Sequence, residues 1–181
     1  MRRHGLTRAG QVTLEEHAAS VVTTCRYLVL ATSSLGGTPW VTPVYFAASD
    51  PWTFWWVSSL ETLHSRNVAV NPQVALTVFD ATVRFGQAAA VYVAAWAEQC
   101  PSARVTEGIA VYAERSLQHG GERWTEASVT GAARLRLYRA RASRVDVLNR
   151  DAGPDRRIRV WPAKDSGPED RCRRVDQRSD A

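Results

Sequence analysis

The side chains with the clearest potential for chemistry gather between positions 58 and 67. Ser58 and Ser59 end an apolar stretch, and Thr62, His64 and Arg66 follow within a few positions. Hydroxyl and main-chain N–H groups at the junction of a strand and a helix can bind a phosphate, with His64 or Arg66 supplying positive charge. The same hydroxyl types also serve as helix caps. The pattern alone therefore leaves two interpretations open, an anion site and a capped helix.

No other group of residues predicts a catalytic side chain or a metal site. The sequence lacks a Gly-x-Ser-x-Gly elbow, and none of Cys25, Cys100 and Cys172 lies near a histidine in sequence. The four histidines show no metal-ligand spacing such as His-x-x-x-His. The odd number and wide spacing of the cysteines indicate unpaired thiols in a reducing cytosol.

Length and composition predict a globular protein with one folded domain. The chain has 181 residues, of which 45% are hydrophobic and seven are tryptophan. The net charge of +5 and the pI of about 9.6 reflect basic residues that cluster at the two ends of the chain. The middle carries no nucleic-acid-reading motif, and no apolar segment is long enough to span a bilayer. We expect a cytoplasmic protein that binds neither nucleic acid nor membrane.

Patterning along the chain predicts many strands and few helices. A Thr-x-x-Glu capping box at Thr13 predicts a helix over about 13–24. Strands are expected at 26–32, 40–47, 53–58, 73–80, 88–99 and 133–148, and helices at 61–70, 103–119 and within 122–131. The folded domain covers 1–150 and includes a helical insertion at about 103–131. Beyond it, 151–181 is expected to be a largely flexible extension in which only 158–161 looks orderable.

The strands and their short links indicate an antiparallel β-barrel with helical additions. No Gly-x-Gly-x-x-Gly follows a strand, which argues against a dinucleotide-binding Rossmann fold. Pro43 lies inside the strand expected at 40–47. Because proline cannot donate a ladder hydrogen bond, this position must face a bulge, a sheet edge or a ligand.

Three segments in order carry a family resemblance. ATSSLGGTPWVTPVYF (31–46), FWWVSSLETLHSRNVAVNPQVALTVFD (54–80) and AVYVAAWAEQ (90–99) resemble the pyridoxamine 5′-phosphate oxidase-like, flavin-binding split-barrel family. The likeness covers about 14–98, and RLRLYRA (134–140) is similar to a strand of an actinobacterial branch. The resemblance implies a six-stranded antiparallel split β-barrel, mainly β with peripheral helices. It also implies a homodimer that binds two flavins, FMN or a deazaflavin coenzyme, at the subunit interface.

The resemblance also implies a set of cofactor contacts. Carried over by position, the isoalloxazine edge would meet Thr42, Pro43 and Val44, the ribityl chain would pass Val57, Ser58 and Ser59, and the phosphate would meet Thr62 and His64. The family's phosphate helix commonly reads Ser-Arg-Lys where this chain reads Thr62, Leu63 and His64. Two fixed cations are thus replaced by one weak base, whose pKa we expect near about 6.5 if the site is partly exposed.

The leading functional hypothesis is an FMN-dependent oxidoreductase that transfers hydride between the flavin N5 and an unidentified small molecule. One alternative is a deazaflavin-dependent reductase of the same fold. Another is a non-catalytic barrel that binds flavin or haem. A haem site would need a reachable axial histidine, and His64 is the only histidine in the matched segments.

Overall fold

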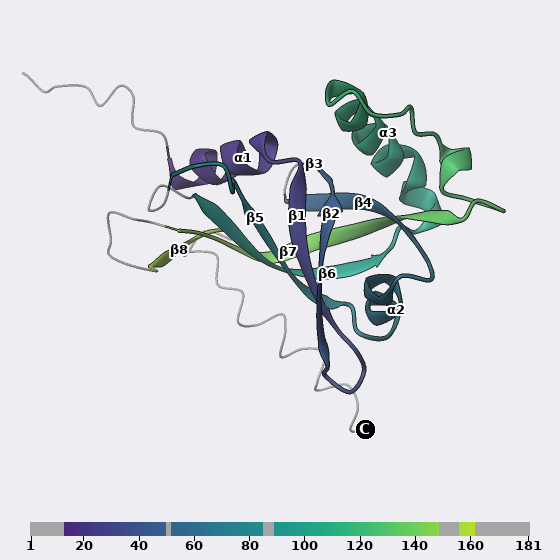
Figure 1. The fold of residues 1–181 in the computed structure, drawn as a ribbon, viewed down its shortest axis with the longest axis horizontal. Coiled ribbons are helices and arrows are strands. Elements are labelled where there is room, and N and C mark those ends of the chain that lie inside the picture. Colours follow the sequence, from purple (N-terminus) through teal and green to yellow (C-terminus); the bar gives the residue numbers. More distant parts are fainter. Residues whose placement is uncertain (1–12, 50–51, 85–88, 149–155, 162–181) are drawn as a thin grey trace, which may run out of the picture.

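The structure is a strongly curled antiparallel sheet with helices packed on it (Figure 1), seen in a computed structural model that describes residues 13–49, 52–84, 89–148 and 156–161. The strands are β1 (Tyr27–Ser33), β2 (Pro39–Tyr45), β3 (Ala47–Ser49), β4 (Thr53–Ser59), β5 (Gln73–Phe79), β6 (Ala90–Gln99), β7 (Leu135–Leu148) and β8 (Arg157–Trp161). The helices are α1 (Leu14–Thr24), α2 (Leu63–Val70), α3 (Ser102–Gln118) and the 3₁₀ turn η1 (Glu126–Ser128).

Strand order shows how the sheet closes. The order is β2-β1-β5-β6-β7-β4-β3, and β8 pairs with β7 outside this path. Its two end strands, β2 and β3, are separated in the chain by Phe46 alone, so they are two parts of one bent strand. Counted that way, β1, β2–β3, β4, β5, β6 and β7 form a six-stranded barrel. The predicted mainly-β split barrel is confirmed.

The barrel opens on one side of this bend. β3 pairs with β4 only between Ala47 and Ser49, opposite Trp55 to Thr53. Past that point β4 pairs only with β7, while β2 pairs only with β1. The split therefore lies between β2 and the second half of β4. Helix α2 follows β4 directly and packs against β1, β2 and β6.

Period-2 alternation in β4 places neighbouring aromatic side chains in two different cores. Phe54 and Trp56 lie inside the barrel, and Trp56 stacks on Tyr138 with ring centroids 5.5 Å apart. Trp55 points outward into a second cluster under α3 that includes Leu137. All three β4 aromatics are fully buried. Core packing therefore accounts for the whole aromatic run of β4.

Element boundaries follow the predicted ones closely. The capping box is present, with the Thr13 N–H donating to the Glu16 carboxylate at 2.7 Å. The second helix begins at Leu63 rather than at 61 because Thr62 is its N-cap. Within 122–131 only the single turn η1 forms. Residue 88, the expected start of β6, and most of the extension, 151–155 and 162–181, lie outside the described residues.

Candidate functional site

The hydroxyl-rich segment predicted from sequence forms one connected cluster at the start of α2. His64 Nε2 lies 2.8 Å from Ser58 Oγ and 3.1 Å from Thr62 Oγ1. Thr62 Oγ1 also lies within hydrogen-bond distance of Ser65 Oγ, at 2.8 Å. We call Ser58, Thr62, His64 and Ser65 the α2 cluster. The cluster is compatible with both interpretations of the sequence, a capped helix and an anion site. Its hydroxyls lie at the N-terminus of α2, where they can cap the helix and where the helix dipole favours an anion.

A tight turn between β4 and α2 builds this cluster. The Ser59 carbonyl accepts hydrogen bonds from the Thr62 N–H at 3.3 Å and from Thr62 Oγ1 at 3.0 Å. Ser59 Oγ accepts from the Glu61 N–H at 3.2 Å. The turn thus reverses the chain within three residues and directs the first turn of α2 back toward the end of β4.

His64 is more enclosed than the sequence suggested. Only 5% of the residue is exposed, and burial lowers the pKa of its imidazole below the ordinary value. The condition for a pKa near 6.5, partial exposure, is therefore not met. His64 is a neutral hydrogen-bonding group at physiological pH, and positive charge for a phosphate must come from another side chain.

A fixed cation stands across the sheet from this cluster. Arg136 on β7 is directly opposite Ser58, which places the two side chains on the same face. Its guanidinium donates to the main-chain carbonyls of Gly131, Ala133 and Leu135. Sequence analysis missed this residue because β4 and β7 are far apart in the chain. The alternation in RLRLYRA shows only that Arg136 and Tyr138 share a face.

Pro43 occupies a sheet edge, one of the three settings predicted for it. The Phe46 N–H donates to the Arg26 carbonyl, and the Ser34 N–H donates to the Thr38 carbonyl, so even-numbered β2 residues direct their main-chain groups toward β1. The odd-numbered Pro43 therefore has its nitrogen and carbonyl on the side of β2 that faces the split. No ladder bond is lost there.

The other predicted cofactor contacts differ in burial and in free hydrogen-bonding groups. Val44 is buried in the barrel core, and Val57 packs against the cluster under α3. Thr42 Oγ1 is buried and has no hydrogen-bond partner among the residues that the structure describes. Of the side chains on β2, Thr42 thus has unused hydrogen-bonding capacity next to the split.

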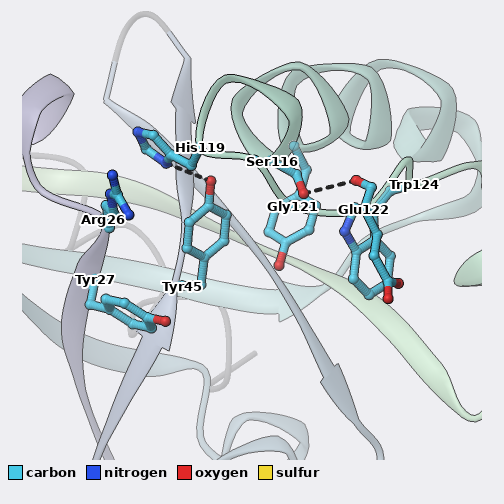
Figure 2. Close-up of a pocket in the computed structure, with 10 residues that line it drawn as sticks. Arg26, Tyr27, Tyr45, Ser116, His119, Gly121, Glu122 and Trp124 are labelled. Carbon is cyan, nitrogen blue, oxygen red and sulfur yellow. Dashed lines mark hydrogen bonds between the residues drawn. The ribbon is translucent and has the colours of Figure 1, made fainter.

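A second site lies near the other end of β2 (Figure 2). A cavity of about 340 Å³ opens between the start of β1, the end of β2 and the end of α3, lined by Tyr27, Tyr45 and His119 among others. Tyr45 Oη donates to the Arg115 carbonyl at 2.9 Å and lies 2.8 Å from His119 Nδ1. Sequence analysis missed this cavity because its walls come from segments about seventy positions apart.

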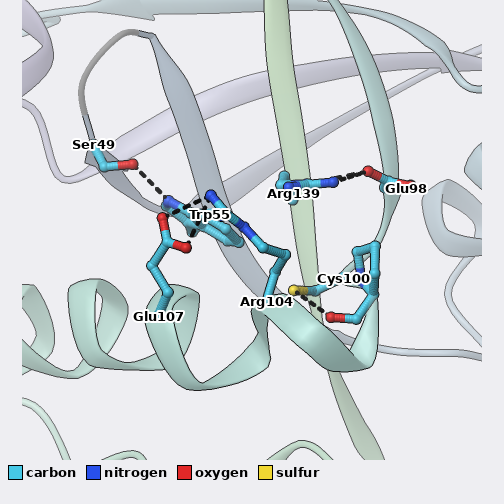
Figure 3. A network of polar contacts seen from close by, with 8 residues as sticks. Ser49, Trp55, Glu98, Cys100, Arg104, Glu107 and Arg139 are labelled. Carbon is cyan, nitrogen blue, oxygen red and sulfur yellow. Dashed lines mark hydrogen bonds and ion pairs between the residues drawn. The ribbon is translucent and has the colours of Figure 1, made fainter.

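The polar contacts near the start of α3 have a structural explanation (Figure 3). Trp55 Nε1 donates to Ser49 Oγ at 3.0 Å, and Arg139 pairs with Glu98 across β6 and β7. Cys100 is buried beside them, and this burial raises the pKa of its thiol. A protonated thiol is a poor nucleophile, so this network stabilises the sheet and holds no reactive group.

Metal and membrane binding gain no support from the described part of the chain. Across residues 13–49, 52–84, 89–148 and 156–161, no three His, Cys, Asp or Glu side chains gather as a metal site would require. None of the described helices is long and apolar enough to cross a bilayer.

Solved structures that resemble this chain include haem and flavin proteins. A haem-binding protein from Mycobacterium smegmatis superposes with a TM-score of 0.66 at 17% identity, covering 83% of this chain. The haem storage protein HutZ from Vibrio cholerae gives 0.58 at 22% identity over 72% of this chain and 90% of its own. An FAD-binding protein from Mesorhizobium loti gives 0.55 at 20% identity, covering 71% and 89%.

At these low identities, the TM-scores establish a shared fold and no more. The chain spans only 59% of the M. smegmatis protein. No curated protein matches the sequence. A family model described as pyridoxamine 5′-phosphate oxidase matches residues 14–148, from the first residue of α1 to the last residue of β7. Because that match covers well over half of the sequence, the chain belongs to the pyridoxamine 5′-phosphate oxidase family.

Proposed function

We propose that the protein binds FMN and is an oxidoreductase acting on a small molecule. The observation that carries this proposal is the position of Arg136 directly opposite Ser58 of the α2 cluster, beside the split. Hydroxyls, helix N–H groups and a fixed guanidinium are the groups that bind phosphate in proteins. Family membership and the FAD-binding neighbour support a flavin as the molecule that carries the phosphate.

Residues of this chain fit an elongated flavin at the split. The start of α2, with Ser58, Thr62 and His64, would hold the phosphate end, and Arg136 would supply the charge that a neutral His64 lacks. Along β2, the outward carbonyl of Pro43 and the unpartnered Thr42 hydroxyl would meet the ring. Val57 and Ser59 border the β4 side of the split.

When bound, a flavin supplies hydride transfer at its N5 atom. The chain's contribution is to bind and orient. The turn at Ser59 fixes the start of α2, and the β1 ladder holds β2 rigid beside the split. We name no side chain as a proton donor or acceptor for this reaction.

A flavin titration tests the proposal. FMN added to the purified protein should bind with quenching of its fluorescence, and Arg136→Gln should weaken FMN by about tenfold, because one charge-assisted contact is lost. Riboflavin, which lacks the phosphate, should bind both proteins equally. Arg134→Gln changes an exposed neighbour and is the matched control. Failure of the parent protein to take up FMN would contradict the proposal, whereas uptake of a deazaflavin coenzyme instead would favour the reductase alternative.

Haem binding is a second candidate, favoured by the haem proteins from M. smegmatis and V. cholerae. His64 is a poor axial ligand as it stands, because its Nε2 is hydrogen-bonded to Ser58 and the ring is buried. An absorption spectrum taken after haem addition separates the two candidates. A Soret band shifted by the protein, without FMN uptake, would replace the flavin proposal.

We also propose a cytoplasmic homodimer in which each barrel completes the partner's flavin site. Trp40 and Val41 on β2 are 46% and 57% exposed, although both are apolar and next to the split. Exposed apolar side chains of this size favour burial against another molecule. Light scattering should give twice the chain mass, and Val41→Glu should shift the protein to monomer. A parent protein that is monomeric at micromolar concentration would exclude this arrangement.

A further inference from the structure

We propose that the cavity beside Tyr45 binds a small planar phenol, with the phenol hydroxyl donating to His119 Nε2 and the ring lying against the aromatic walls. The cavity volume of about 340 Å³ lies in the range of small-molecule sites. Every wall comes from this chain, and no contribution from a bound flavin is needed. The phenol proposal and the flavin proposal can therefore be tested, and disproved, independently.

Tyr45 fixes which nitrogen of His119 is available. The Tyr45 hydroxyl has one proton, and it donates that proton to the Arg115 carbonyl at 2.9 Å. The same oxygen lies 2.8 Å from His119 Nδ1, and the two Tyr45 contacts are satisfied together when that nitrogen carries the proton. Neutral His119 then carries its proton on Nδ1 and its lone pair on Nε2. Among the residues that the structure describes, Nε2 has no hydrogen-bond partner.

The charges around the cavity keep His119 neutral and favour an acidic ligand. Burial, followed by the positive charges of Arg115 and Arg26, lowers the pKa of the His119 imidazole. A neutral imidazole offers its lone pair to an O–H donor. Arg26 lines the cavity and stabilises negative charge that develops on a phenol oxygen. Glu122 is the acidic lining residue; it is exposed, so solvent screens its charge.

Aromatic walls select a planar ring. Tyr112 meets the Tyr45 ring edge-on at 5.7 Å and the Trp124 ring edge-on at 5.4 Å. Tyr27 packs edge-on against Tyr45 at 5.9 Å. Such surfaces bind a flat apolar ring by stacking or edge contacts. Combined with the acceptor at His119 Nε2, they match a phenol better than a sugar, a peptide or a bare hydrocarbon.

The loop after α3 holds this geometry in place. Gly120 has a φ of 75°, a left-handed conformation that lets the chain reverse after the helix. The Gly121 N–H then donates to the Ser116 carbonyl at 2.8 Å, and Ser116 Oγ donates to the Glu122 carbonyl at 2.9 Å (Figure 2). The segment carrying Trp124 is thereby tied to the helix that carries Tyr112.

Titration of the whole protein with three probes tests the phenol site, at a pH about one unit below the pKa of 4-nitrophenol so that this phenol keeps its proton. 4-Nitrophenol should bind about tenfold more tightly than 4-nitroanisole, because the methyl ether cannot donate to the acceptor. 4-Nitrobenzoate should bind more weakly than 4-nitrophenol. His119→Phe keeps a ring but removes the acceptor, so the two neutral probes should then bind equally. His17→Phe, an exposed histidine on α1, should leave all affinities unchanged.

A second variant keeps the test valid if His119→Phe does not fold. Trp124→Ala removes an aromatic wall and keeps His119, so it should weaken 4-nitrophenol and 4-nitroanisole by the same factor. The proposal is overturned if the parent protein binds neither probe, if it binds both equally, or if 4-nitrobenzoate binds most tightly. It is also overturned if His119→Phe, with an unchanged circular dichroism spectrum, keeps the preference for 4-nitrophenol.

Discussion

The two ends of β2 lead to two polar sites that use histidine in opposite ways. At the α2 cluster, His64 is buried and its Nε2 is bonded within the protein. At the cavity, Tyr45 orients His119 through Nδ1 and leaves Nε2 without a partner in the described part of the chain. The first arrangement joins the end of β4 to the start of α2 through hydrogen bonds within the protein. The second leaves His119 Nε2 available to a ligand or to solvent.

The two sites also differ in how they are held. The α2 cluster is local, because hydrogen bonds join residues within one turn and one helix. The cavity depends on α3, which is fastened to the rest of the molecule by one arginine and by close packing on β4. Disturbing α3 should therefore cost more stability than disturbing the α2 cluster.

The largest expected effect is that of Arg115→Met. The Arg115 guanidinium donates to four main-chain carbonyls, those of Val22, Thr23, Cys25 and Phe46. These bonds tie α3 to the end of α1 and to the bend that closes the barrel. Losing them should lower the free energy of unfolding by about 3 kcal/mol, measured by chemical denaturation. Arg104→Met removes an exposed ion pair on the same helix and should change stability by no more than about 0.5 kcal/mol. Similar losses for both would show that α3 is not anchored through Arg115.

Gly108→Ala tests the close packing of α3 on the sheet. A Cβ at Gly108 would overlap the six-membered ring of Trp55 and would lie 2.9 Å from Leu137 Cδ2. Both partners are fully buried, so neither can move aside freely. We expect a loss of about 2 kcal/mol. Ala110→Gly, at an exposed position of α3, is the control and should cost about 1 kcal/mol through helix propensity alone. A neutral Gly108→Ala would mean that α3 can shift on the sheet.

This contrast also explains what the sequence could predict. Thr13 and Thr62 cap their helices through neighbours three residues away, and such local chemistry is legible in the sequence. Most strands were placed within two residues for the same reason. The bend at Phe46 that closes the barrel, the position of Arg136 opposite Ser58 and the Tyr45–His119 pair depend on contacts between distant segments. Nothing local in the sequence encodes them, which is why the α2 cluster was found and the cavity was missed.

The two histidines should respond differently to pH and salt. Their folded pKa values are both lowered, so the unfolded chain gains a proton first as pH falls below about 6.5, and stability declines in that window. For His64 the cause is burial alone, whereas Arg115 and Arg26 also contribute at His119. His64→Gln and His119→Gln should each reduce the fall in the free energy of unfolding between pH 7 and about pH 5, by about 1 kcal/mol or less.

Added salt separates the two contributions. Raising ionic strength screens the arginine charges and should shrink the effect of His119→Gln, while the effect of His64→Gln persists. Thermal unfolding at several pH values, at low and high salt, measures both. If salt changed the effects of the two variants equally, the arginine charges would not distinguish the environment of His119 from that of His64.

The smallest effect on stability, and the most direct test of the comparison, is that of Tyr45→Phe. The ring keeps its edge contact with Tyr112, so only the hydroxyl bonds to Arg115 and His119 are lost, at a cost of about 1 kcal/mol or less. Without the Tyr45 oxygen, no acceptor stabilises the proton on His119 Nδ1. The imidazole should then become a mixture of the Nδ1–H and Nε2–H tautomers. Ring ¹⁵N chemical shifts report this directly, with His64 as the internal reference that must not change. If His119 already shows a mixture in the parent protein, or keeps the Nδ1–H form in the variant, then Tyr45 does not orient it, and Nε2 is no more available than the enclosed nitrogen of His64.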